Sequence, residues 1–250
     1  MTERVTSRDL ARMTARTSLL QATWNYERQQ GLGWAYCFAP VLERLYPDAA
    51  VRRARLAEHT GYFNTQPTLA SVALGAVAHL EEQRAAGVLP EDDGILRVKS
   101  MLGSALAAVG DRLFWFTLRP FAALLGVWLA LDRPWLGALA LLACYNAGHL
   151  TLRVRGVRWG YALGPEVLGA GLRGNLERTM RTLAGLGSGL VGITVAALLV
   201  PRGDPQSLPF QATLAAGIAL GMITAQRARP SSTQWALGAG ALCLAAAWFR

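Results

Sequence analysis

Three neutral polar side chains stand together just before an apolar stretch: Asn64, Thr65 and Gln66, which are followed by Pro67. Amide and hydroxyl groups offer hydrogen-bond donors and acceptors without charge, so they suit a neutral polyhydroxylated ligand. The same residues also fit an Asx-turn that merely precedes the next helix. The sequence therefore predicts either a binding segment or a turn at this point.

A lone carboxylate, Asp111, opens the stretch GDRLFWFTLRP at residues 110–120. A charge at the edge of an apolar segment is costly unless it is paired, hydrated or used, so Asp111 is a second candidate functional residue. Alternatively, Asp111 caps a helix, and Arg112 and Arg119 mark the lipid boundary. If Arg112 pairs with Asp111, the carboxylate is neutralised and structural.

The motifs of common catalytic and metal sites are missing from the sequence. There is no GxxxxGK[ST] phosphate loop and no GxSxG nucleophile elbow. The histidines lack the spacing of a ligand set and the cysteines form no CxxC pair; they are His59, His79, His149, Cys37, Cys144 and Cys243. We therefore expect no catalysis by this chain alone, no cofactor, no metal site and no disulfide framework.

The composition predicts a membrane protein. Hydrophobic residues make up 52% of the 250 residues, which is high for a soluble protein. The net charge is +9, and Lys99 is the only lysine, so the basicity comes almost wholly from arginine. These arginines fall between apolar segments, where they act as orientation signals rather than as a nucleic-acid surface. Membrane lipid is therefore an expected partner, and nucleic acid is not.

We expect an all-α fold, with an amphipathic, interfacial helical region at residues 1–110 and a membrane region at 111–250. The membrane region contains a hairpin and about three further transmembrane helices, at 113–131, 135–152, 183–200, 210–225 and 234–249. The arginine-rich loops then share one side with the N-terminus, which places the N-terminus in the cytoplasm and the C-terminus outside. Arg119 and Asn146 leave open whether the hairpin spans the bilayer or is re-entrant.

Residues 25–37 (NYERQQGLGWAYC) change from polar groups to two glycines and then to aromatic residues. Gly31 and Gly33 permit a backbone turn or a close approach that other residues resist. Trp34 and Tyr36 are typical of a wet interface. We therefore expect this block to contain a tight backbone contact beside an exposed aromatic surface.

Three blocks, taken together and in this order, resemble the IID component of mannose/fructose/sorbose-family phosphotransferase-system (PTS) permeases. They are NYERQQGLGWAYC at residues 25–37, HTGYFNTQP at 59–67 and AAVGDRLFWFTLRP at 107–120. RWGYALG at 158–164 is similar to a later Gly-Tyr segment of the family. The resemblance covers roughly residues 17–200.

The resemblance implies a multi-pass subunit of the bacterial inner (plasma) membrane that pairs with a IIC subunit to form a sugar pathway. IIA and IIB phosphocarrier proteins would supply phosphate, which IIB would pass to the incoming hexose-like sugar. An oligomer of IIC–IID pairs is also implied. By resemblance, the residues that contact the sugar or IIC would be Asn64, Thr65, Gln66 and Asp111. The scaffold or docking motif would comprise Asn25, Tyr26, Glu27, Gly31 and Gly33.

The chain departs from the family pattern before and after Gly110. Where the family usually has a Gly-Pro-Leu-Ala-Gly run, this chain has Ser104, Ala105, Leu106, Ala107 and Ala108, and Arg112 stands where serine is usual. Loss of the proline and a glycine favours a more regular helix. The C-terminal third is also short.

The leading hypothesis is a IID subunit that acts with IIC in hexose translocation coupled to phosphorylation by IIB. The departures around Gly110 motivate an alternative, a degenerate and non-transporting regulatory or assembly subunit of a PTS complex. An independent membrane-bound enzyme is disfavoured, because the sequence lacks a catalytic constellation.

Overall fold

The computed structural model describes residues 4–89, 94–199, 209, 212–213 and 216–218. Helices dominate this part of the chain, and its only β-bridges are isolated ones. The elements are α1 (Ser7–Arg16), the 3₁₀ turn η1 (Thr17–Leu19), α2 (Gly31–Leu45), α3 (Ala49–His59), α4 (Ala70–Ala85), α5 (Gly94–Leu113), the π-helix η2 (Phe114–Leu118), α6 (Arg119–Ala130), α7 (Pro134–Leu163), the 3₁₀ turn η3 (Gly164–Leu168) and α8 (Ala170–Leu199). The predicted all-α class is confirmed.

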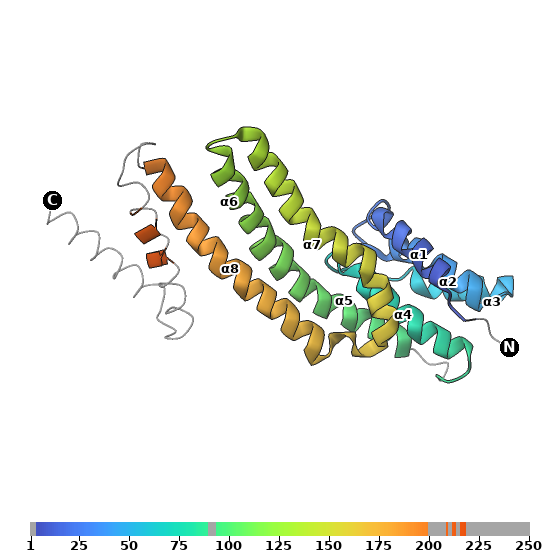
Figure 1. Cartoon of the computed structure of the whole chain (residues 1–250). Coiled ribbons are helices and arrows are strands. Elements are labelled where there is room, and N and C mark those ends of the chain that lie inside the picture. The colour runs from blue at the N-terminus through green and yellow to red at the C-terminus, as the bar shows by residue number, and fades with distance from the viewer. Residues whose placement is uncertain (1–3, 90–93, 200–208, 210–211, 214–215, 219–250) are drawn as a thin grey trace.

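The helices form two parts that α4, α5 and α7 join (Figure 1). Helices α1 to α4 gather at one end, and α6, α7 and α8 run side by side away from it. Helix α7 packs along α6 with its first half and against α4 with its second half. The polar N-terminal part therefore lies at one end of a long apolar helical layer.

The first helices begin where capping side chains satisfy the free N–H groups of their first turns. At α1, the Thr6 and Asp9 side chains each accept from the other residue's backbone N–H. At α3, the carboxylate of Asp48 accepts hydrogen bonds from the N–H groups of Ala50 at 2.8 Å and Val51 at 2.9 Å. These caps replace partners that the helix itself cannot supply.

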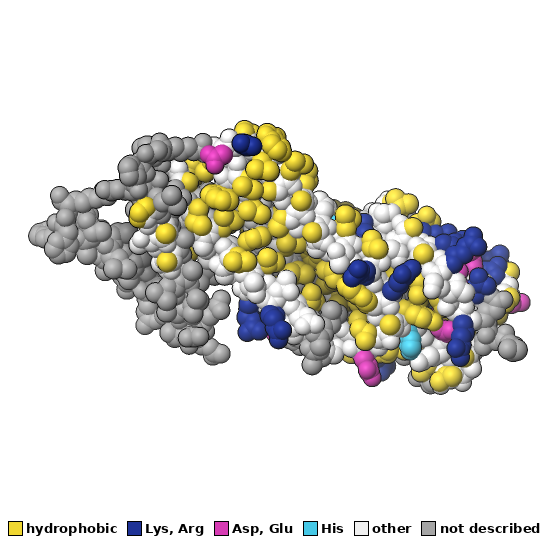
Figure 2. Space-filling view, viewed as in Figure 1, with side chains coloured by type: hydrophobic (Ala, Val, Ile, Leu, Met, Phe, Trp, Pro, Cys, Tyr) yellow, Lys and Arg dark blue, Asp and Glu magenta, His cyan; other side chains and the backbone are white. Residues whose placement is uncertain are grey.

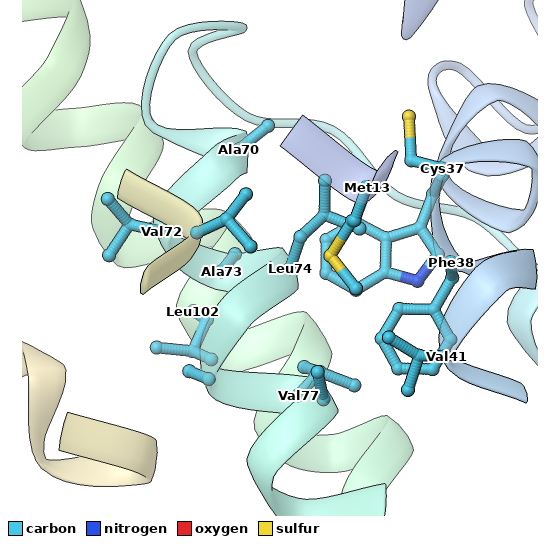
Figure 3. Packing of buried hydrophobic residues seen from close by; sticks show 14 of the residues in the cluster. Met13, Cys37, Phe38, Val41, Ala70, Val72, Ala73, Leu74, Val77 and Leu102 are labelled. Carbon is cyan, nitrogen blue, oxygen red and sulfur yellow. The ribbon is translucent and has the colours of Figure 1, made fainter. Parts of the chain in front are cut away.

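A tightly packed core joins α2, α4 and α5 (Figure 3). Trp34 is fully buried between Phe38 and Phe63, so the expectation that it lies at a wet interface is wrong. Tyr36 is 45% exposed and packs under the guanidinium group of Arg16. The difference follows from helical geometry, because residues two apart on a helix point to nearly opposite sides.

Glycines allow α4 and α7 to touch backbone to backbone. A Cβ atom on Gly75 would overlap the carbonyl oxygen of Val157, and one on Gly160 would overlap that of Val72. The block at residues 158–164 contains Gly160 and also Tyr161, whose hydroxyl donates a hydrogen bond to Glu82 of α4. The fourth family-like block is therefore the surface of α7 that holds α4.

Two helical stretches are long and apolar enough to cross a membrane, at residues 94–130 and 134–167. Only 28% and 6% of their apolar windows are buried, so they are not core helices of a water-soluble protein. Hydrophobic side chains cover this region of the surface, and arginines gather at the opposite end (Figure 2). These stretches contain all but the last residue of the predicted segment 113–131 and all of 135–152, and α8 contains most of 183–200. Most of 210–225 and all of 234–249 lie outside the described residues.

The predicted boundary between regions 1–110 and 111–250 falls inside α5, which runs without a break from Gly94 to Leu113. The residues that replace the family's Gly-Pro run, 104–108, are all helical. This agrees with the regular helix expected once proline and glycine are lost.

Candidate functional site

The three polar residues before α4 lie in an extended break between α3 and α4, and they are not equivalent. Asn64 is exposed, whereas Thr65 and Gln66 are each only 4% exposed. The Oε1 atom of Gln66 accepts hydrogen bonds from the N–H groups of Thr68 at 2.7 Å and Leu69 at 3.1 Å. Gln66 therefore caps the turn into α4, which makes it structural and leaves Asn64 as the amide that faces outward.

Gln30 connects the block at residues 25–37 to the block at 59–67. Its side-chain Nε2 donates to the carbonyl of Thr65 at 2.7 Å, and its Oε1 accepts from the N–H of Thr65 at 3.2 Å. The backbone N–H of Gln30 also donates to the carbonyl of Phe63 at 2.9 Å. A buried amide thus holds the extended segment as a neighbouring strand would. Sequence reasoning missed Gln30, although it lies within the block.

The predicted scaffold or docking motif divides into a turn and two exposed side chains. The side chain of Asn25 accepts from the N–H of Arg28 at 2.8 Å and closes the turn. Tyr26 is 88% exposed, and Glu27 is also on the surface. A Cβ on Gly31 would overlap the carbonyl of Gly61, and a Cβ on Gly33 that of Leu20. Asn25 and the glycines are therefore structural, and Tyr26 and Glu27 are available to a partner.

Asp111 lies inside the last turns of α5, so it does not cap a helix. Its neighbour Gly110 faces Gln66, where an added Cβ would lie 2.5 Å from the Gln66 Cβ. Among the described residues, the carboxylate of Asp111 has no ion pair or hydrogen bond, and Arg112 is exposed and does not pair with it. The capping and neutralised-pair interpretations are thus both wrong. Asp111 is a partly buried residue that follows Gly110, the residue that packs against Gln66.

A π-helix, residues 114–118, begins three residues after Asp111. The hydroxyl of Thr117 donates to the carbonyl of Arg112, five residues earlier, at 2.8 Å. The wider turn buries Phe114 against Tyr145 and His149 of α7 and leaves Phe116 77% exposed. Single π-turns inside α-helices occur frequently at functional sites.

His149 connects α7 to the start of α4, next to the extended break. Its Nδ1 atom lies 2.8 Å from the hydroxyl oxygen of Thr68, two residues before α4 begins. This contact had only a weak signal in the sequence, where His149 is typical of a boundary histidine in an apolar helix. Residues of the first three family-like blocks and His149 of α7 therefore meet around residues 63–69.

A buried polar cluster lies behind this segment. His59 accepts a hydrogen bond from Trp34 and lies 3.8 Å from Glu81, and Glu81 accepts a hydrogen bond from Tyr46 at 3.1 Å. Burial lowers the pKa of His59 below its usual value, although Glu81 opposes this shift. His59 is therefore neutral near pH 7, and its approach to Glu81 is not an ion pair.

The site offers neutral amides, hydroxyls and one carboxylate, without the geometry of a catalytic centre. No group of three or more His, Cys, Asp or Glu side chains that could hold a metal occurs in residues 4–89 and 94–199 or the few described beyond them. Such groups suit the recognition of a neutral polar ligand. Together with the long apolar helices, they define a helical membrane protein whose polar break interrupts the helical packing.

Comparison with known proteins makes the class specific. The PTS system mannose/fructose/sorbose family IID component matches residues 4–202. The mannose-specific EIID component of Escherichia coli (strain K12) is 34% identical over 209 residues, which are 83% of this chain and 72% of that protein. The sorbose-specific EIID component of Klebsiella pneumoniae is 35% identical over 208 residues, 83% of this chain and 74% of that protein. The chain belongs to the mannose/fructose/sorbose family of PTS IID components.

Solved structures agree with this assignment. A cryo-EM structure of the mannose transporter ManYZ in complex with microcin E492 contains a chain that is 28% identical. It aligns with a TM-score of 0.62 over 97% of this chain and 96% of that one. A chain described as a membrane protein gives a TM-score of 0.71 at 28% identity, with 97% of each chain covered.

Proposed function

We propose that this IID component acts with a IIC subunit in the translocation of a hexose-like sugar, coupled to its phosphorylation by IIB. One observation carries the proposal: three contacts hold the segment at residues 63–66 in its extended conformation. Gln30 bonds to Thr65, Gly110 packs against Gln66, and His149 of α7 contacts Thr68 just after the segment. Segments far apart in sequence converge on this segment and leave Asn64 exposed, and Asp111 follows Gly110 on α5. A neutral sugar needs such uncharged donors and acceptors, and a carboxylate adds a strong acceptor.

The proposal includes the family's division of labour. The chain supplies no phosphotransfer residue, and IIA and IIB carry the phosphate. Its exposed Tyr26 and Glu27 are assigned to docking, and its apolar helices to lipid and to IIC. The bacterial inner membrane is the proposed location, with the N-terminus in the cytoplasm and the C-terminus outside, and IIC–IID pairs are proposed to form an oligomer.

Uptake of radiolabelled sugars tests the function. A bacterial host without its own mannose-family permease would carry the IIA, IIB and IIC partners with or without this chain. We expect uptake of a hexose such as mannose only with the full set. Unchanged uptake on omission of the chain would contradict the transport role.

Paired substitutions test the site. Asn64→Ala removes an amide, and Asp111→Asn removes the negative charge and replaces one acceptor oxygen by a donor. Each should lower uptake about tenfold or more if the group contacts sugar or IIC. The matched controls are Asn146→Ala, an amide bonded within α7, and Asp132→Asn in the turn between α6 and α7. Normal uptake in both site variants, with IIC still bound, would favour the regulatory or assembly subunit.

A further inference from the structure

The buried Lys99 is the strongest unexplained feature of the described structure. It is the only lysine of the chain, it lies on α5, and it is 3% exposed. Its Nζ atom donates a hydrogen bond to the carbonyl oxygen of His59 at 2.9 Å. A methionine would bury a stem of similar length without the cost of removing an ammonium group from water. The burial of the ammonium group therefore requires a functional explanation.

The surroundings of Lys99 compensate its charge without a carboxylate. No carboxylate oxygen lies within ion-pair distance of its Nζ atom in the described part of the chain. Instead, Nζ lies 5.0 Å from the ring centroid of Trp34 and 5.7 Å from that of Phe63, distances that allow cation–π attraction. The carbonyl of His59 belongs to the last turn of α3, where a cation is also favoured by the helix dipole.

These contacts place Lys99 against both ends of the segment that leads to Asn64. His59 begins this segment, and Phe63 ends it. One turn along α5, Gly103 packs under the same phenyl ring, where an added Cβ would lie 3.0 Å from Phe63 and 3.3 Å from the Asn64 carbonyl oxygen. Helix α5 therefore packs against one side of the backbone between residues 59 and 64 and fixes its position.

We propose that Lys99 is a positioning residue, which holds the 59–64 backbone so that Asn64 stays correctly placed for its ligand. This inference rests on the proposed function of Asn64. Lys99 itself does not contact the sugar, because it is buried behind Phe63. Its removal should therefore weaken ligand affinity more than the maximal rate of transport.

Uptake kinetics test this inference with Lys99→Met and a matched control on the same helix, Arg97→Met, whose side chain is exposed. We expect Lys99→Met to raise the apparent KM for mannose about tenfold, the effect typical of losing a hydrogen bond from a charged donor. The maximal rate per folded IIC–IID complex should stay within about twofold. Lys99→Arg, which keeps a cation, should restore part of the affinity, and Arg97→Met should behave as the wild type.

A purely structural lysine predicts a different result. Lys99→Met would then reduce the amount of folded complex and the maximal rate together, with an unchanged apparent KM, and the proposal would be overturned.

Amide hydrogen exchange of the purified wild-type and variant proteins separates this proposal from the transport function. Lys99→Met should accelerate exchange at residues 60–65 and leave α7 unchanged. That result supports the positioning role even where wild-type uptake is absent and the transport function has failed. Unchanged exchange at residues 60–65 would overturn the positioning role even where uptake is normal.

Discussion

A single missing methyl group, at Gly110, allows α5 to lie against the extended break. A Cβ there would lie 2.5 Å from Gln66 Cβ and 3.0 Å from Leu69 Cδ1, so Gly110→Ala must displace the Gln66 cap. We expect a loss of about 1–3 kcal/mol in the free energy of unfolding and a strong decrease in sugar uptake. Thermal unfolding of the purified protein and uptake assays measure both effects.

Gly174→Ala provides the matched control for this change, because nothing lies within 4 Å of the added Cβ. It should be neutral or slightly stabilising, since alanine favours helix over glycine. Equal behaviour of the two alanine variants would show that the contact between Gly110 and Gln66 is unimportant.

At His59, burial makes the stability of the protein depend on pH. Burial lowers the pKa of His59 in the folded protein. The unfolded chain, with a histidine pKa of about 6.5, therefore binds the proton more readily. The stability contribution of neutral His59 is complete above this value and is lost as the pH falls toward the folded pKa. We expect a decrease of at most about 1.4 kcal/mol per pH unit between about pH 6.5 and 5.5.

The variant His59→Gln should remove this part of the pH dependence, measured as unfolding free energy at about pH 7.5 and 5.5. Asp9→Asn is the control, because hydrogen bonds from Thr6 and Arg44 outweigh the effect of burial and lower the pKa of Asp9, which then titrates at more acidic pH. A slope that persists unchanged in His59→Gln would assign the effect to another group.

At the scale of elements, the crossing of α4 and α7 positions Thr68 against His149. Gly160→Leu would force the helices apart, because Gly160 packs directly on the Val72 backbone. We expect a loss of at least about 1–3 kcal/mol in unfolding free energy, and loss of uptake as Thr68 and His149 separate. Melting and uptake of Gly160→Leu would be compared with Gly174→Leu, whose position is open; equally mild effects would contradict the prediction.

Local patterns predicted the helices better than the contacts between them. The helices that contain most of 113–131 and all of 135–152 are visible in the sequence because a long apolar run is a local signal. The hydrogen bonds from Gln30 to Thr65 and between Thr68 and His149 join residues 35 and 81 positions apart, which periodicity does not encode. The π-helix was missed as well, because its composition, FWFTL, also suits an ordinary α-helix.

The four candidate contact residues also show that sequence patterns do not predict side-chain contacts. Asn64, Thr65 and Gln66 are consecutive and chemically alike, and the sequence assigned them one shared role. The structure separates them, because Gln66 turns inward to cap α4 while Asn64 stays exposed. Arg112 and Asp111 are adjacent and of opposite charge, yet a helix directs neighbouring side chains about 100° apart, and they form no pair.

At the scale of the whole molecule, the hairpin of α6 and α7 sets the topology. Residues 114–130 form about 25 Å of continuous helix, which nearly matches the roughly 30 Å hydrocarbon core of a bilayer. With the N-terminal part in the cytoplasm, as proposed, the turn at 131–133 reaches the outer face if the hairpin spans. A re-entrant hairpin would keep this turn within protein or lipid.

Cysteine labelling distinguishes these arrangements. In a variant whose native cysteines are replaced, Asp132→Cys and Arg8→Cys would be treated separately with a membrane-impermeant maleimide; both positions are exposed. We expect Asp132→Cys to react in intact cells, and Arg8→Cys only after permeabilisation, because arginine-rich segments remain in the cytoplasm. The opposite pattern would invert the topology. An Asp132→Cys variant that stays unreactive even after permeabilisation, while Arg8→Cys reacts, would identify the hairpin as re-entrant. The polar break at residues 63–66 would then lie away from any continuous path across the bilayer.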